Sequence, residues 1–106
     1  FVFNISANSF FQTNTPQAER LYEKVLEFAR IEKQDVVWDL YAGTGTISLF
    51  LARQAARVIG FEIAESAVRD ARKNAEEHRV RNTEFIAGDL LHKLRETQPK
   101  PHILIT

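Results

Sequence analysis

The 106 residues contain no cysteine and no methionine. Without cysteine the chain can form neither a disulfide framework nor a thiolate metal site, and it has no thiol nucleophile. No apolar run approaches the ~20 residues that a membrane-spanning helix needs. Basic and acidic residues both number 14, so the net charge gives no general attraction to nucleic acid. Hydrophobic residues make up 44%, an ordinary globular share that excludes disorder as the main state.

The absence of methionine also means that Phe1 is not a translation start. Residues 101–106 form an apolar β-type run that stops without a polar tail. Both ends favour a piece of a longer protein. We therefore expect one partial domain over residues 1–106, with a lead-in segment over 1–15 and a core over 16–106. No targeting segment is visible.

Helix and strand patterns alternate along the chain. Residues 1–5 are β-prone, and Thr15-Pro16 is typical of a helix start because Thr caps and Pro needs no N–H bond there. Apolar residues recur at three- and four-residue spacing as far as Ala29, which predicts a helix. Strands are expected at 36–41, 57–61, 83–87 and 102–106, and helices at 47–55, 64–79 and 90–97. This alternation predicts an α/β fold with a parallel sheet and right-handed crossovers.

Glycine and polar residues follow three of these strands at their carboxyl ends, where open α/β sheets bind ligands. Gly43 and Gly45 allow close backbone approach and leave N–H groups at the next helix start, with the hydroxyl of Thr46 beside them. Glu62 is placed to accept hydrogen bonds from the two hydroxyls of a ribose. Asp89 can accept one from the exocyclic amine of an adenine. The three features predict a nucleoside cofactor.

Each feature also has a plain structural explanation. A Gly-x-Gly turn alone is weak evidence, Glu62 suits a helix N-terminus, and Asp89 suits an N-cap or a turn. Their order, each after its own apolar strand, favours the cofactor over these explanations. Ile63 and Leu90 are then expected to contact the adenine ring.

Two residues bear on which cofactor is bound. Ser48 stands where the nicotinamide-binding pattern G-x-G-x-x-G has its third glycine. The carboxylate of Asp39 disfavours a pyrophosphate but suits the ammonium group of an amino acid. The pattern therefore favours S-adenosyl-L-methionine. The three histidines have no partner at ligand spacing, so no metal site is expected.

Several segments resemble the RNA 5-methyluridine (uracil-C5) methyltransferases. The similarity covers essentially the whole chain, and it lies in residues 9–14 (SFFQTN), 17–22 (QAERLY), 39–46 (DLYAGTGT), 60–62 (GFE) and 67–74 (AVRDARKN). The order of the first and third of these segments is far more specific than the glycine turn alone. Within the family the chain is most similar to enzymes that methylate 23S ribosomal RNA, with the transfer RNA branch as the alternative.

The resemblance implies a Rossmann-like class I methyltransferase fold, of which the chain holds the N-terminal half. It implies parallel strands in the order 3-2-1-4 and truncation after the fourth. It further implies S-adenosyl-L-methionine as cofactor, RNA as partner, and a cytoplasmic enzyme with no membrane contact. The family's cofactor-binding positions match Gln12, Tyr41, Thr46, Glu62 and Asp89, and the residue-based reasoning adds Asp39, Gly43 and Gly45.

The chain departs from the family in two places. Ala42 stands where many members have a cysteine that is not the nucleophile. The family's Asp-Pro-Pro-Arg element, catalytic Cys and general-base Glu would follow Thr106, so this chain alone is expected to be inactive. In the family the Cys adds to uracil C6, C5 is methylated, and the C5 proton is then removed. Methylation of another base or a protein side chain, a noncatalytic nucleotide-binding role and a disfavoured NAD-dependent oxidoreductase are the alternatives.

Overall fold

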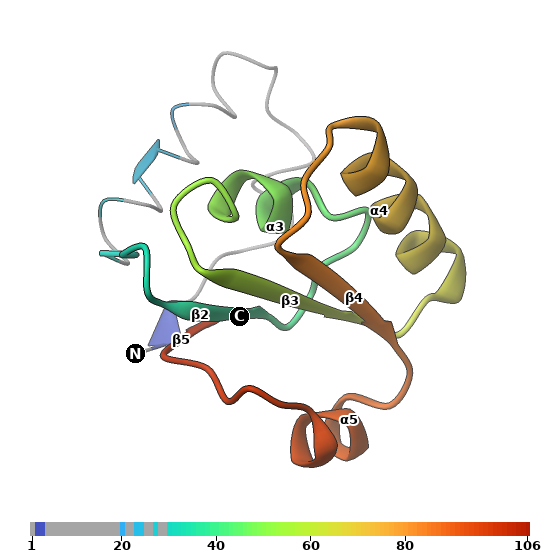
Figure 1. The fold of residues 1–106 in the computed structure, drawn as a ribbon. Helices are drawn as coiled ribbons and strands as arrows, with labels where there is room; N and C mark the ends of the chain where they lie inside the picture. Colours follow the sequence, from blue (N-terminus) through green and yellow to red (C-terminus); the bar gives the residue numbers. More distant parts are fainter. Residues whose placement is uncertain (1, 4–19, 21–22, 25–26, 28–29) are drawn as a thin grey trace.

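A computed structural model describes residues 2–3, 20, 23–24, 27 and 30–106 of the chain. Within them, parallel strands form one sheet in the order β1-β5-β2-β3-β4. The strands are β1 (Val2–Phe3), β2 (Val36–Asp39), β3 (Arg57–Glu62), β4 (Thr83–Ala87) and β5 (Ile103–Ile105). The four strands of the predicted core are thus confirmed in the order 3-2-1-4, and β1 adds a short edge strand beside β5 (Figure 1).

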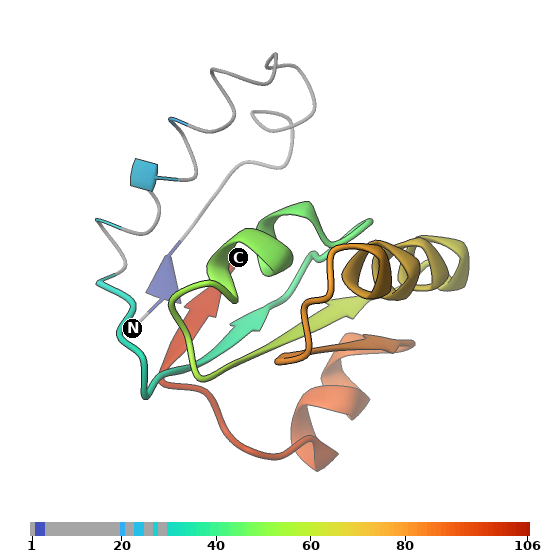
Figure 2. The ribbon, with the colours of Figure 1, turned by 45° about the horizontal axis from the view of Figure 1, so that its top comes forward.

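Helices cover both faces of the sheet. The helices are α3 (Thr46–Leu51), α4 (Glu65–Glu77) and α5 (Leu90–Glu96). Figure 2 shows α3 and α4 on one face and α5 on the other. Successive strand residues point to opposite faces, so Val37 and Val58 pack with Leu51 of α3, whereas Trp38 and Ile59 pack on the α5 side. The near-continuous apolar runs of β2 and β3 therefore fill two cores at once.

The helix that follows β2, α3, is shorter than its sequence pattern predicts. A helix was expected over 47–55, but α3 ends at Leu51. The side-chain amide of Asn82 donates hydrogen bonds to the carbonyls of Ala52, at 2.8 Å, and Ala55, at 3.1 Å. These carbonyls are held by a residue that lies far along the chain, so residues 52–55 form a turn instead of a further helical turn.

Most of the predicted helix before the sheet lies outside the described residues, as does Gln12. The members of this segment that the structure describes are helical and exposed: Arg20, Glu23, Lys24 and Glu27. Across the described part of the chain, no helix has the length and apolar character needed to cross a bilayer.

Candidate functional site

The glycine turn, Glu62 and the Gly88-Asp89 pair meet at the end of the sheet where its strands have their carboxyl ends. The N–H of Gly43, after β2, donates to Oε1 of Glu62 at the end of β3, at 3.1 Å. The N–H of Gly88, after β4, donates to the backbone carbonyl of Glu62 at 3.3 Å. Parallel pairing places these strand ends side by side. Glu62 is therefore the point at which the three features connect.

The turn between β2 and α3, residues 42–45, is packed against the sheet and α4. Gly45 has φ +87°, and a Cβ there would lie 2.9 Å from the ring of Phe85 and 3.0 Å from Cβ of Ala71, so only glycine fits. The N–H of Gly45 donates to the carbonyl of Ala42 at 2.8 Å. At Gly43 a Cβ would meet no atom of the described residues within 4 Å. The turn is thus fixed on its inner side and open on its outer side.

The carboxylate of Glu62 has room for a ligand. Its Oε1 accepts from Gly43 N–H, and its Oε2 accepts from Ala64 N–H at 2.9 Å. A carboxylate offers about four acceptor positions, so within the described part of the chain each oxygen keeps one beyond its backbone bond. The two backbone donors hold the carboxylate in a fixed orientation, which suits it to a pair of neighbouring hydroxyls.

Asp39 lies beneath the turn and not on its surface. It is only 2% exposed. Its Oδ2 accepts from the hydroxyl of Ser48 at 2.7 Å, and its Oδ1 accepts from the N–H of Tyr41 at 3.3 Å. Burial raises the pKa of Asp39 from 3.8 to about 6. The bonds from Ser48 and Tyr41 lower this pKa, and the nearby charge of Glu62 raises it. The bond to Tyr41 turns the chain, so β2 ends at Asp39 and not at residue 41 as predicted.

Apolar side chains are exposed at the same end of the sheet. Tyr41 is 65% exposed, Ile63 is 78% exposed and Leu91 is 73% exposed. The structure packs Leu90 against the Trp38 side of the core and leaves the neighbouring Leu91 exposed. Exposed apolar surface beside oriented polar groups is typical of a site for a planar ligand.

The remaining predicted residues lie around this end of the sheet. Asp89 is exposed and caps α5, since its Oδ1 accepts from the N–H of Leu91 at 3.2 Å. Thr46 is exposed at the first position of α3. Among the described residues, no side chain caps the start of α3, where Gly45 is the N-cap. The start of α3 therefore consists of backbone groups alone, without a capping side chain among the described residues.

Two contacts escaped the sequence reasoning. Ser48 is fully buried and bound to Asp39, although the sequence showed it only as the residue in place of a third glycine. Asn74 of α4 donates from Nδ2 to the carbonyl of Thr44 at 3.0 Å. The only sequence signal for Asn74 is its place in the segment 67–74, which resembles the family.

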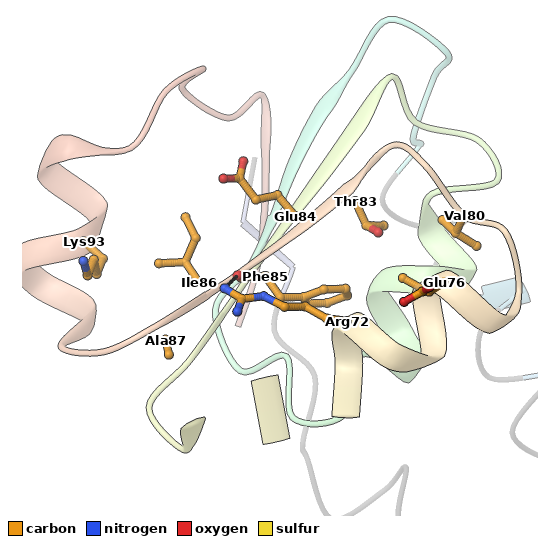
Figure 3. A pocket seen from close by; sticks show the side chains of 10 residues that line it. Arg72, Glu76, Val80, Thr83, Glu84, Phe85, Ile86, Ala87 and Lys93 are labelled. Atoms are coloured by element: carbon orange, nitrogen blue, oxygen red, sulfur yellow. Dashed lines mark hydrogen bonds between the residues drawn. The ribbon is translucent and has the colours of Figure 1, made fainter. Parts of the chain in front are cut away.

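A hollow of about 570 Å³ lies elsewhere, along the outer edge of β4 (Figure 3). Arg72 and Glu76 of α4 line one side, and Lys93 of α5 lines the other. Arg72 Nη2 donates to the carbonyl of Phe85 at 2.8 Å. None of the predicted site residues that the structure describes lines this hollow. The strand ends, where the oriented polar groups are, stay the candidate site.

Comparison with known sequences identifies the family. The sequence model of the tRNA (Uracil-5-)-methyltransferase family matches residues 1–91. The chain belongs to this family. An uncharacterized RNA methyltransferase of Chlorobaculum tepidum is 51% identical over 98% of the chain and 23% of its own length. Another, from Caldanaerobacter subterraneus, is 50% identical over 97% of the chain and 23% of its own length. The chain thus spans about a quarter of the curated relatives that it matches.

Solved structures of methyltransferases share the fold. An RNA methyltransferase from Salinibacter ruber, in complex with S-adenosyl-L-homocysteine, matches with a TM-score of 0.72 and 32% identity over 88% of this chain and 60% of that one. Trm5b from Pyrococcus abyssi matches with a TM-score of 0.70 and 29% identity over 89% of this chain and 27% of that one. The predicted Rossmann-like class I methyltransferase fold is confirmed.

Proposed function

We propose that this chain is the cofactor-binding part of an S-adenosyl-L-methionine-dependent enzyme that methylates C5 of a uridine in RNA. The observation that carries the proposal is the Glu62 carboxylate, which Gly43 and Ala64 orient beside an open glycine turn. Membership of the family and the curated relatives named RNA methyltransferases support the reaction class.

The residues at the strand ends fit S-adenosyl-L-methionine. In this proposal Glu62 accepts hydrogen bonds from both ribose hydroxyls, and Asp89 accepts one from the adenine amine. Tyr41 and Ile63 offer apolar surface to the nucleoside. The bound cofactor supplies an electrophilic methyl group. The four residues named in this paragraph each lie at the end of a strand or in the turn that follows it.

Asp39 acts from below the turn. Asp39 is almost fully buried and does not lie on the surface. We propose that its negative charge attracts the ammonium group of the cofactor's methionine end. Gln12, Gly43, Gly45 and Thr46 are proposed to contact the same end. Gln12 lies outside the described residues, and its role depends on the resemblance alone.

The proposed target is a uridine of 23S ribosomal RNA, with transfer RNA as the alternative. The sequence resemblance favours the ribosomal target, whereas the family description names transfer RNA. The uracil-C5 reaction needs a cysteine thiolate, and these 106 residues contain no cysteine. We therefore place the catalytic residues in a part of the protein outside them, and we infer that the enzyme works in the cytoplasm.

Calorimetric titration with S-adenosyl-L-homocysteine tests the cofactor site. The Glu62→Ala substitution removes the ribose contact and is expected to weaken binding by about tenfold or more, because hydrogen bonds to a charged group are strong. Glu84→Ala is the matched control, since Glu84 is an exposed glutamate of β4 paired with Arg57. Unchanged binding by the Glu62 variant would sink the ribose assignment.

The RNA target is tested in cells that lack the gene. We expect mass spectrometry of purified RNA to show the loss of one 5-methyluridine from 23S ribosomal RNA. Its loss from transfer RNA instead would establish the alternative. If 5-methyluridine stays unchanged in both RNAs, the uracil-C5 assignment is wrong.

A further inference from the structure

The glycine turn (residues 42–45) is held by a side chain of α4, the helix that follows α3 and β3 in the chain. Asn74, on α4 and half-buried, donates from Nδ2 to the carbonyl of Thr44 at 3.0 Å. Thr44 lies between Gly43 and Gly45, which have φ values of +54° and +87°. The amide of Asn74 therefore fixes the orientation of the peptide group that joins Thr44 to Gly45.

This peptide group is the part of the turn that most needs an external contact. Glycine adopts left- and right-handed conformations with similar ease, so the backbone beside each glycine can rotate at little steric cost. The carbonyl of Thr44 and the N–H of Gly45 belong to one peptide group. The carbonyl accepts from Asn74, and the N–H donates to the carbonyl of Ala42 at 2.8 Å. The two bonds hold the group at both of its polar ends.

The orientation of the Thr44 carbonyl decides what the turn presents to a ligand. The oxygen accepts from Asn74 of α4, and in this proposal the ligand lies on the side of the turn that is open at Gly43. Rotated outward, it would place a partial negative charge against the carboxylate of a methionine group. One amide on α4 thus favours the form of the turn that can accept an anionic group.

We propose that Asn74 is a positioning residue for cofactor binding, which acts by keeping the Thr44 carbonyl away from the ligand. This inference rests on the proposed function, because it takes S-adenosyl-L-methionine as the ligand. Asn74 does not touch the cofactor in this proposal. Substituting Asn74 is expected to weaken cofactor binding by more than the accompanying loss of fold stability explains.

The chain offers a matched control in Asn82. Its side-chain amide also donates to backbone carbonyls, at 2.8 and 3.1 Å, and it is also half-buried. Asn82 precedes β4, at the opposite end of the sheet from the glycine turn. Removing it takes away similar hydrogen bonds without releasing Thr44.

The test compares the full-length wild-type protein with Asn74→Ala, Asn74→Asp and Asn82→Ala. The aspartate keeps the side-chain shape but cannot donate when ionised. Titration with S-adenosyl-L-homocysteine is expected to show binding about tenfold weaker in both Asn74 variants and within about twofold of wild type in Asn82→Ala. Thermal unfolding is expected to show similar losses of stability for the two alanine variants. In turnover assays the Asn74 variants should raise the KM for the cofactor and keep kcat.

Binding by the Asn74 variants within twofold of wild type overturns the inference and leaves the proposed function intact. Equal weakening by Asn82→Ala also overturns it, because the effect would then follow stability alone. Failure of the wild-type protein to bind S-adenosyl-L-homocysteine contradicts the proposed function itself, and the inference with it. The three results are distinguishable in one set of titrations.

Discussion

Replacing Asp39 with asparagine is expected to stabilise the fold at neutral pH. The carboxyl is 2% exposed, and its burial raises the pKa from 3.8 to about 6. A pKa change of this size makes the ionised form less favourable in the folded chain by about 3 kcal/mol. Asparagine carries no charge; its oxygen can accept from the N–H of Tyr41, and its NH2 group then donates to the hydroxyl of Ser48, which accepts instead of donating. Because a neutral amide accepts weaker bonds, we take about 3 kcal/mol as the upper bound of the gain.

The effect has a defined pH dependence. The pKa of Asp39 is higher in the folded than in the unfolded chain, so the folded chain binds the proton more tightly. The wild-type free energy of unfolding therefore falls as the pH rises from 3.8 to about 6, and it stays at the lower level above that range. The asparagine variant lacks this slope. The difference between the two proteins should be largest at pH 7 and small near pH 4.

Urea unfolding at several pH values between 4 and 7.5 measures this difference. Trp38 adjoins Asp39, is 3% exposed and is the single tryptophan of the chain, so its fluorescence reports unfolding. Ser48→Ala is the companion variant, and it should lower the stability at pH 7 by about 1–3 kcal/mol because it removes a donor from a buried anion. The reasoning fails if Asp39→Asn is less stable than wild type at pH 7, or if the gap is equal at pH 4.5 and pH 7.

Substitutions at three further positions test other parts of the structure. Gly45→Ala should lower the free energy of unfolding by about 1–3 kcal/mol in urea, because the new Cβ meets Phe85 at 2.9 Å with φ at +87°. An unchanged midpoint would contradict this packing. Asp89→Ala should lower it by about 1 kcal/mol by removing the cap of α5, and Asp89→Asn should retain most of that stability. Arg72→Ala should increase self-association in sedimentation velocity, because it exposes the Phe85 carbonyl on the edge of β4. A cleanly monomeric variant would show that Arg72 does not protect this edge.

The sequence was most informative where local pattern and tertiary environment agree. The strand over residues 83–87 has the predicted bounds, and the helix expected over 64–79 is seen as α4, with Val68, Ala71 and Ala75 buried. Apolar spacing determines both elements, and spacing is visible in one sequence. The short α3 was not predictable, because Asn82 holds the carbonyls that follow it from a distant position.

The candidate site was predictable in its location but not in its internal contacts. Parallel strands place their ends together, so Gly43, Glu62 and Asp89 were expected to converge. Burial of Asp39 was not visible, because it depends on how the turn folds over it. The donors Ser48 and Asn74 reach the site through tertiary packing, which no sequence spacing encodes. The assignment of Gly43, Glu62 and Asp89 to cofactor binding stays a prediction, which the titrations test.

The position of β5 bears on how the chain acquires its structure during synthesis. β5 lies between β1 and β2, so Val2 pairs in register with Leu104, more than a hundred positions later in the chain. The β2, β3 and β4 strands pair in order of synthesis and can assemble while the ribosome is still working. The edge of β2 that β5 covers stays open until residues 103–105 leave the exit tunnel. For that interval the nascent chain presents an uncovered apolar strand edge, which is the kind of surface that chaperones protect.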